Sequence, residues 1–190
     1  MYRVLEHALA ALLMLAPVGA LGAEPPGLPA ELEASFDVPA SRVSGTLRYP
    51  VRSGETVTIA AGDLTVESVT VSEAPAEFFR KDGILSVASR ATGTVVVRFS
   101  TVVKGGDAVG DRNYGVVTST IDSRGISLTG PWHPRPEGAA SWTLTVRLPA
   151  GYEAGSEAES VTRTPKDGGV ELTFRFPHAA ESLSLSLIHI

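Results

Sequence analysis

Residues 142–148, with the sequence WTLTVRL, alternate large apolar and polar side chains. A period of two is that of a β-strand with one face buried and the other in water. The same alternation recurs at residues 32–38 and 171–176. Together the three stretches predict antiparallel sheets, in which one face commonly remains solvated. The apolar members of the first stretch are Trp142, Leu144, Val146 and Leu148.

Two further stretches are strand-like without clean alternation. Residues 94–103, TVVVRFSTVV, are nearly apolar throughout, which is typical of a strand in the middle of a sheet. Residues 63–71, DLTVESVTV, change phase halfway, and a β-bulge at Glu67 or Ser68 would restore a common face. Gly and Pro separate these runs, and no window after residue 30 has the pattern of a helix. The predicted fold class is therefore all-β, an antiparallel β-sandwich.

The composition limits the class of partner. The chain has 190 residues, is 43% hydrophobic and carries a net charge of −5 without a basic run. Nucleic acid is therefore not an expected partner, because it requires a positive surface. The chain contains no cysteine, which excludes disulfides, thiolate metal sites and cysteine nucleophiles.

The N-terminus resembles a secretory signal. An early Arg3 precedes an apolar run over residues 8–16, and small residues follow, with cleavage expected after Ala20 or Ala23. The alternative is an N-terminal membrane anchor, but the run is shorter than the ~20 residues that a span needs. We therefore predict a signal peptide at residues 1–23, a Pro-rich spacer at 24–30 and no stable membrane span. The expected location is exported, either periplasmic or extracellular.

No catalytic or metal-binding pattern is present. The histidines are His7, His133, His178 and His189, and none has a second histidine at metal-ligand spacing. There is no G-x-S-x-G nucleophile motif. We therefore predict neither catalytic residues nor metal ligands within this chain.

The stretch GPWHPRP, residues 130–136, places a Trp and a His among three prolines. It is either a rigid loop that carries a catalytic histidine or a structural connection between strands. We favour the connection, because each proline fixes φ and stiffens the corner, while His133 has no identified partner to orient it. Trp132 would then cover one end of the sandwich.

Five segments, in this order, resemble the N-terminal β-domain of the aminopeptidase N family of zinc metallopeptidases. The resemblance spans roughly residues 31–185 and implies a saddle-shaped β-domain at 31–184. The Pro-rich loop lacks the family's usual Cys or Asp, and residues 118–120 offer no counterpart for its substrate-contacting Gln. The segments are LEASFDVPASRVSGTLRYPV (32–51), DLTVESVTVSEAPAEF (63–78), GILSV with TGTVVVRFSTVV (83–103), PWHPRPEGAASWTLTVRLPAGYEAGSEAE (131–159) and GGVELTFRFPHAAESLSLSL (168–187).

The resemblance also implies that catalysis takes place in a domain other than this one. The family's zinc ligands and catalytic Glu lie in a following domain, so zinc is expected there and no cofactor is expected in this chain. The expected partners are the chain's own missing catalytic domain and, for the whole protein, peptide substrates. In the family the Pro-rich loop leads toward the peptidase domain, which makes Trp132, His133 and Arg135 a predicted interdomain contact.

Residues 185–190, LSLIHI, match a translation of CTG-TCT-CTT-ATA-CAC-ATC, a transposase mosaic-end sequencing adapter. We expect them to derive from that adapter, with the natural gene interrupted inside the last strand of the β-domain. The alternative is a true terminus with an apolar tail.

The whole protein is then expected to be an exported zinc aminopeptidase. The rival functions are a secreted β-sandwich binding or adhesion module without enzymatic activity and a family relative whose peptidase centre has decayed.

Overall fold

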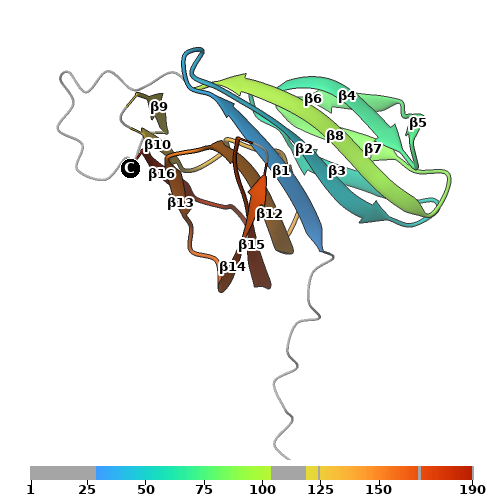
Figure 1. Ribbon diagram of the computed structural model, residues 1–190. Helices are drawn as coiled ribbons and strands as arrows, with labels where there is room; N and C mark the ends of the chain where they lie inside the picture. The colour runs from blue at the N-terminus through green and yellow to red at the C-terminus, as the bar shows by residue number, and fades with distance from the viewer. Residues whose placement is uncertain (1–28, 104–118, 124, 167, 190) are drawn as a thin grey trace, which may run out of the picture.

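Three β-sheets make up the computed structural model of the chain in Figure 1, which describes residues 29–103, 119–123, 125–166 and 168–189. These residues form sixteen strands, and no helix occurs among them. The predicted all-β class is therefore confirmed. The predicted signal peptide and all but the last two residues of the predicted spacer lie outside the described residues.

The largest sheet has eight strands in the order β14-β15-β12-β1-β2-β8-β4-β5. Its strands at the β12 end run at a steep angle to those at the β8 end, so the sheet is strongly twisted (Figure 1). All neighbouring strands are antiparallel except β1 and β12, which are parallel. The strands are β1 (Ala30–Asp37), β2 (Arg42–Val51), β4 (Thr65–Val71), β5 (Ala74–Pro75), β8 (Gly93–Val102), β12 (Ala140–Pro149), β14 (Ser160–Lys166) and β15 (Gly169–Ala180).

Two four-stranded sheets lie beside opposite ends of the large sheet (Figure 1). One has the order β11-β3-β7-β6 and lies beside β2, β4 and β8, and the other has the order β13-β16-β10-β9 and lies beside β12 and β15. We call them the N-side sheet and the C-side sheet. Their strands are β3 (Thr56–Ala60), β6 (Phe78–Lys81), β7 (Ile84–Ala88) and β11 (Arg135–Pro136), and β9 (Thr120–Asp122), β10 (Gly125–Leu128), β13 (Tyr152–Gly155) and β16 (Leu185–His189).

Strand β1 joins the two halves of the large sheet. On one side it pairs antiparallel with β2, so that Leu32 lies opposite Leu47. On the other side it pairs parallel with β12, in a register that runs from Ala30 opposite Trp142 to Ser35 opposite Arg147. The blue β1 accordingly lies between the green strands and the orange and red strands in Figure 1.

The core follows the predicted alternation. The predicted apolar side chains of β12 at positions 142, 144, 146 and 148 are buried, and so are those of β15 at positions 172, 174 and 176. Strand β8 lies between β2 and β4, which confirms the central strand expected from its apolar sequence. The β4–β8 register shifts between Val66 and Ser68, so the predicted bulge is confirmed with Glu67 as the extra residue.

Residues 185–189 form β16 and pair with both β10 and β13. Leu185 and Leu187 are almost fully buried in the core. Residues 185–189 are thus paired within the folded unit that the structure describes, and the predicted domain boundary at residue 184 stays a prediction. The origin of these residues in an adapter stays a prediction.

Gly45 of β2 allows the ring of Phe99 to lie against the backbone. Gly45 pairs with Phe99 of β8 on the face that holds the core. A Cβ atom at position 45 would lie 2.8 Å from the Cε1 and Cζ atoms of the Phe99 ring, and it would also collide with the Glu33 carbonyl oxygen. The glycine is thus required by close packing.

We predict that Gly45→Ala lowers the free energy of unfolding by about 1–3 kcal/mol, because the added methyl group overpacks the core. The matched control is Gly155→Ala, since no atom lies within 4 Å of a Cβ built at that position. It should change the free energy of unfolding by less than about 0.5 kcal/mol. Urea denaturation of the two variants measures both effects, and equal midpoints for the two would contradict the packing described here.

Candidate functional site

The stretch GPWHPRP connects the two small sheets. Strand β10 of the C-side sheet ends at Leu128, and β11 of the N-side sheet begins at Arg135. The intervening loop turns at residues 130–132, where the Trp132 amide donates to the Gly130 carbonyl at 3.0 Å. Trp132 is 3% exposed and His133 is 1% exposed, so these two side chains lie within the core, whereas Gly130 and Pro131 are exposed.

His133 lies between two indole rings. Its ring centroid is 4.7 Å from that of Trp132 and 5.2 Å from that of Trp142, with interplanar angles of 73° and 78°. Such edge-to-face geometry is favoured between aromatic rings. Trp142 belongs to β12, so the histidine links the loop to the large sheet.

Both indole N–H groups donate to backbone carbonyls at or just after the end of β15. Nε1 of Trp132 donates to the Leu183 carbonyl at 2.7 Å, and Nε1 of Trp142 donates to the Ala180 carbonyl at 3.0 Å. The loop between the two small sheets is thereby packed against β12 of the large sheet and bonded to the segment that precedes β16. We call Trp132, His133 and Trp142 the tryptophan–histidine cluster.

The His133 ring is held as the neutral Nδ1-protonated tautomer. Its Nδ1 lies 2.9 Å from the Pro134 carbonyl oxygen, which can only accept a hydrogen bond. Nε2 is fully buried and has no hydrogen-bond partner among the described residues. Burial lowers the pKa of the imidazole to about 4; the Pro134 hydrogen bond raises it and the charge of Arg135 lowers it further. At neutral pH this ring is therefore an uncharged packing group that has almost no contact with solvent.

The three residues of the predicted interdomain contact differ in what they can offer. Trp132 and His133 are buried within this chain, whereas Arg135 of β11 is half-buried. Only Arg135 retains substantial side-chain surface for another domain. The contact stays a prediction, and in this structure it would depend on Arg135.

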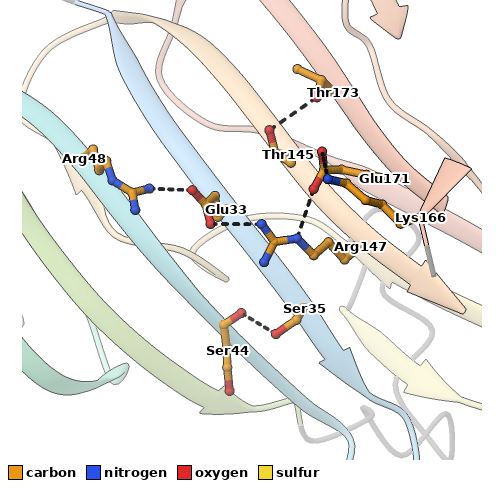
Figure 2. Close-up of polar contacts among 9 residues, drawn as sticks. All are labelled: Glu33, Ser35, Ser44, Arg48, Thr145, Arg147, Lys166, Glu171 and Thr173. Carbon is orange, nitrogen blue, oxygen red and sulfur yellow. Dashed lines mark hydrogen bonds and ion pairs between the residues drawn. The ribbon is translucent and has the colours of Figure 1, made fainter. Parts of the chain in front are cut away.

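A second arrangement of polar groups crosses the solvated face of the large sheet (Figure 2). Charges alternate in sign over five adjacent strands, from β2 through β1, β12 and β15 to β14. The distances are 2.6 Å for Arg48–Glu33, 3.7 Å for Glu33–Arg147, 3.0 Å for Arg147–Glu171 and 3.9 Å for Glu171–Lys166. We call these five residues the charge ladder.

The charge ladder specifies strand neighbours more than it stabilises them. The side chains of Arg48, Glu33 and Arg147 are 38%, 41% and 64% exposed, and exposed pairs contribute at most about 1 kcal/mol. The hydrogen bond to Glu171 and the charge of Glu33 raise the pKa of the Arg147 guanidinium, so this central cation stays charged at physiological pH. Opposite charges face each other at every step, and a two-residue shift of β12 along β15 would remove Glu171 from its place opposite Arg147.

Beside the charge ladder lies an open hollow of about 250 Å³. Its lining includes the small hydroxyl side chains Ser35, Ser44 and Thr46 of β1 and β2, together with Glu67 and Arg98. Both signs of charge line it, and it lacks the largely apolar lining of a usual small-molecule site. It can hold water and polar groups, but it presents no arrangement for acid–base catalysis.

The structure describes no cluster of ionisable side chains that could hold a metal. Within residues 29–103 and 119–189, apart from positions 124 and 167, no three His, Asp or Glu side chains come together. His178 is 93% exposed and lies 3.5 Å from Glu159. Over the same residues, no helix has the length and apolar character needed to cross a membrane.

Sequence reasoning singled out Trp132, His133 and Arg135 but did not connect them with Trp142. Trp142 was recognised only as a core position of an alternating strand. Its pairing with His133 depends on how the loop folds back over β12, for which the sequence carries no local signal. The charge ladder was also missed. Its members look like ordinary charged residues on the solvent-exposed face of a sheet, and only the strand order shows that they are neighbours.

Comparison with known proteins identifies the fold. No family model and no curated protein sequence matches the chain. Solved structures do match. An M1 zinc metallopeptidase from Deinococcus radiodurans is similar with a TM-score of 0.62 and 16% sequence identity. A variant of that protein bound to a Tyr-Ser-Ala substrate matches at 0.62 and 15%, and a two-domain M1 zinc metallopeptidase bound to L-tryptophan at 0.63 and 16%.

In each of these matches the alignment covers 86% of this chain but only 42% of the other chain. The chain thus spans less than half the length of the structures it resembles. At this level of identity the likeness establishes a shared fold.

We predict that Trp132→Phe lowers the free energy of unfolding by about 1 kcal/mol, because the variant loses the hydrogen bond to the Leu183 carbonyl. Trp132→Ala should cost about 3–5 kcal/mol, because it also empties a buried site. Phe79→Ala is the control, since Phe79 is 66% exposed. Chemical denaturation gives all three values. A Trp132→Ala variant as stable as Phe79→Ala would show that Trp132 is not part of the core.

Proposed function

We propose that this chain is the non-catalytic N-terminal β-domain of an exported zinc aminopeptidase. The observation that carries the proposal is the asymmetric match to the M1 zinc metallopeptidases, which covers most of this chain and well under half of theirs. The order of strand and loop motifs along the sequence supports the same assignment. It is a resemblance independent of the structural match.

In the proposed whole protein, catalysis belongs to the part that this chain does not contain. A zinc ion there would supply a Lewis acid for hydrolysis of the N-terminal peptide bond. One of the similar structures was solved with a Tyr-Ser-Ala substrate, which agrees with a short peptide as substrate. The β-domain would form one wall of the peptide cleft and would transfer no proton.

The described residues suit a rigid wall. His133 is neutral and buried, so in this arrangement it cannot reach a substrate, and its role is to pack between two indoles. Arg135 is the residue of the Pro-rich loop that would contact the catalytic domain. The stiffness given by three prolines would reduce the entropy lost when the domains dock.

Export is the second part of the proposal. The apolar run of residues 8–16 and the small residues after it support a cleaved signal peptide. The mature protein would begin after Ala20 or Ala23 and work in the periplasm or outside the cell.

The proposal is tested on the complete gene, obtained by reading genomic DNA past residue 184. We predict an H-E-x-x-H-x18-E pattern in the continuation. The complete protein, expressed with its leader, should be exported, lose the leader, hold one zinc ion and cleave an aminoacyl-anilide. The 190-residue chain should do neither of the last two. Elemental analysis, N-terminal sequencing and an anilide assay provide the readouts.

Several outcomes would contradict this function. A continuation without the zinc pattern would favour the secreted binding or adhesion module. A mature chain that still begins at Met1 would remove the signal peptide. Stoichiometric zinc in the 190-residue chain would place a metal site where none is proposed.

Arg135→Ala in the complete protein should speed limited proteolysis between the domains relative to Arg175→Ala, and equal rates would remove Arg135 from the interface.

A further inference from the structure

The tryptophan–histidine cluster is the point at which the C-side sheet is fastened to the large sheet. The loop that carries Trp132 and His133 leaves β10, and the Trp132 indole donates to the Leu183 carbonyl just before β16, while Trp142 and the Ala180 carbonyl that it bonds belong to β12 and β15 of the large sheet. Strands β10 and β16 are the two inner strands of the C-side sheet. Loss of the cluster would therefore loosen this sheet first.

The environment of His133 tolerates only a neutral ring. Nε2 is buried without a partner, so a proton placed there would have no acceptor among the described residues. The buried polar or charged residues that the structure describes are Ser89, Ser100 and His133, so no carboxylate is buried with the ring. A buried imidazolium without a counter-ion is costly.

The charged groups on the neighbouring segments do not relieve this cost. Arg135, on β11, has the same sign as an imidazolium and acts against it. Glu137, which follows β11, and Glu181, in the segment between β15 and β16, are both exposed. Strand β12 presents Trp142 to the ring. A proton on Nε2 would therefore favour a state in which the ring reaches solvent.

We propose that His133 is an acid-operated latch. While neutral, its ring keeps the two indoles in place and holds the C-side sheet on the large sheet. When Nε2 takes a proton from solvent, the ring leaves its site between the indoles. The loop at residues 129–134 and the strands β10 and β16 then detach, while β1, β2 and β8 remain folded. The device goes beyond the proposed peptidase role and does not depend on it.

The direction of the pH dependence follows from the two states. In the open state the imidazole has its ordinary pKa near 6.5, and in the closed state burial lowers the pKa to about 4. Between these values the open state binds more protons, so the closed state is fully stable above pH 6.5 and loses stability as the pH falls toward 4. From pH 7 to pH 5 the opening equilibrium should shift at least about tenfold.

A second acid-sensitive contact lies outside this pH window. Burial raises the pKa of Glu157, but hydrogen bonds from Ser184 and Ser156 outweigh burial, and the net pKa lies below its ordinary value of 4.5. Glu157 therefore stays ionised between pH 5 and pH 7. A change in that range then reports on histidine rather than on this carboxylate.

The test is amide hydrogen exchange of the 190-residue chain at pH 7 and pH 5, expressed as protection factors corrected for the intrinsic exchange rate. We expect protection in β10 and β16 to fall at least about tenfold, while protection in β2 and β8 changes less than threefold. The chain contains two tryptophans, and both belong to the cluster. Its intrinsic fluorescence should therefore follow the same pH dependence.

Variants assign the effect to His133. His133→Phe keeps an aromatic ring between the indoles but cannot titrate, so it should abolish the pH dependence, and His133→Gln serves if that variant does not fold. His178→Gln is the control, because the His178 side chain is 93% exposed, and it should behave as the unsubstituted chain. Equal loss of protection in β2 and β10, no loss in either, or unchanged pH dependence in a folded His133 variant would each overturn the latch. If neither variant folds, equal loss of protection in β2 and β10, or no loss in either, still overturns the latch in the unsubstituted chain.

Discussion

The parallel pairing of β1 with β12 is the constraint on which the whole fold depends. Strands up to β8 build one end of the large sheet, strands from β12 onward build the other, and β1 lies between them. We call the paired strands β1 and β12 the seam. One face of this seam buries Leu32 and Ala34 beside Leu144 and Val146, which supplies apolar burial at the junction. Since the remaining pairs of the large sheet are antiparallel, this seam alone requires two segments far apart in the sequence to run in the same direction.

Polar groups on the two sides of the seam have different tasks. On the solvated face, Glu33 lies between Arg48 and Arg147, so the first strand is matched electrostatically to both neighbours. On the buried side, the tryptophan–histidine cluster satisfies both indole N–H groups and leaves one imidazole nitrogen without a partner. Buried polar groups without partners are rare in folded proteins, and this one lies where the three sheets join. The exposed charges thus contribute specificity, whereas the buried ring contributes packing that depends on its protonation state.

Local structure followed from the sequence, and the arrangement of the strands did not. The alternation at residues 142–148 predicts which side chains of β12 are buried, and the phase change at Glu67 predicts the bulge in β4. Both depend on neighbouring residues alone. The β1–β12 partnership has no local signal, because β1 alternates in the same way whichever strand lies beside it. The three prolines of the Pro-rich loop predicted a stiff connection, but the burial of His133 depends on Trp142 and on the segment before β16.

The parallel register is tested most directly by a designed disulfide. The 190-residue chain has no cysteine, and Glu31 of β1 lies opposite Thr143 of β12. The double variant Glu31→Cys/Thr143→Cys should form an intramolecular disulfide under mild oxidation, because paired Cα atoms lie within the range that a disulfide spans. Glu31→Cys/Thr145→Cys, shifted by two residues, should form it much more slowly, since diagonal neighbours are about 7–8 Å apart. Rapid cross-linking of the first pair alone is the expected result. Equal rates for the two pairs, or faster cross-linking of the shifted pair, would contradict the account.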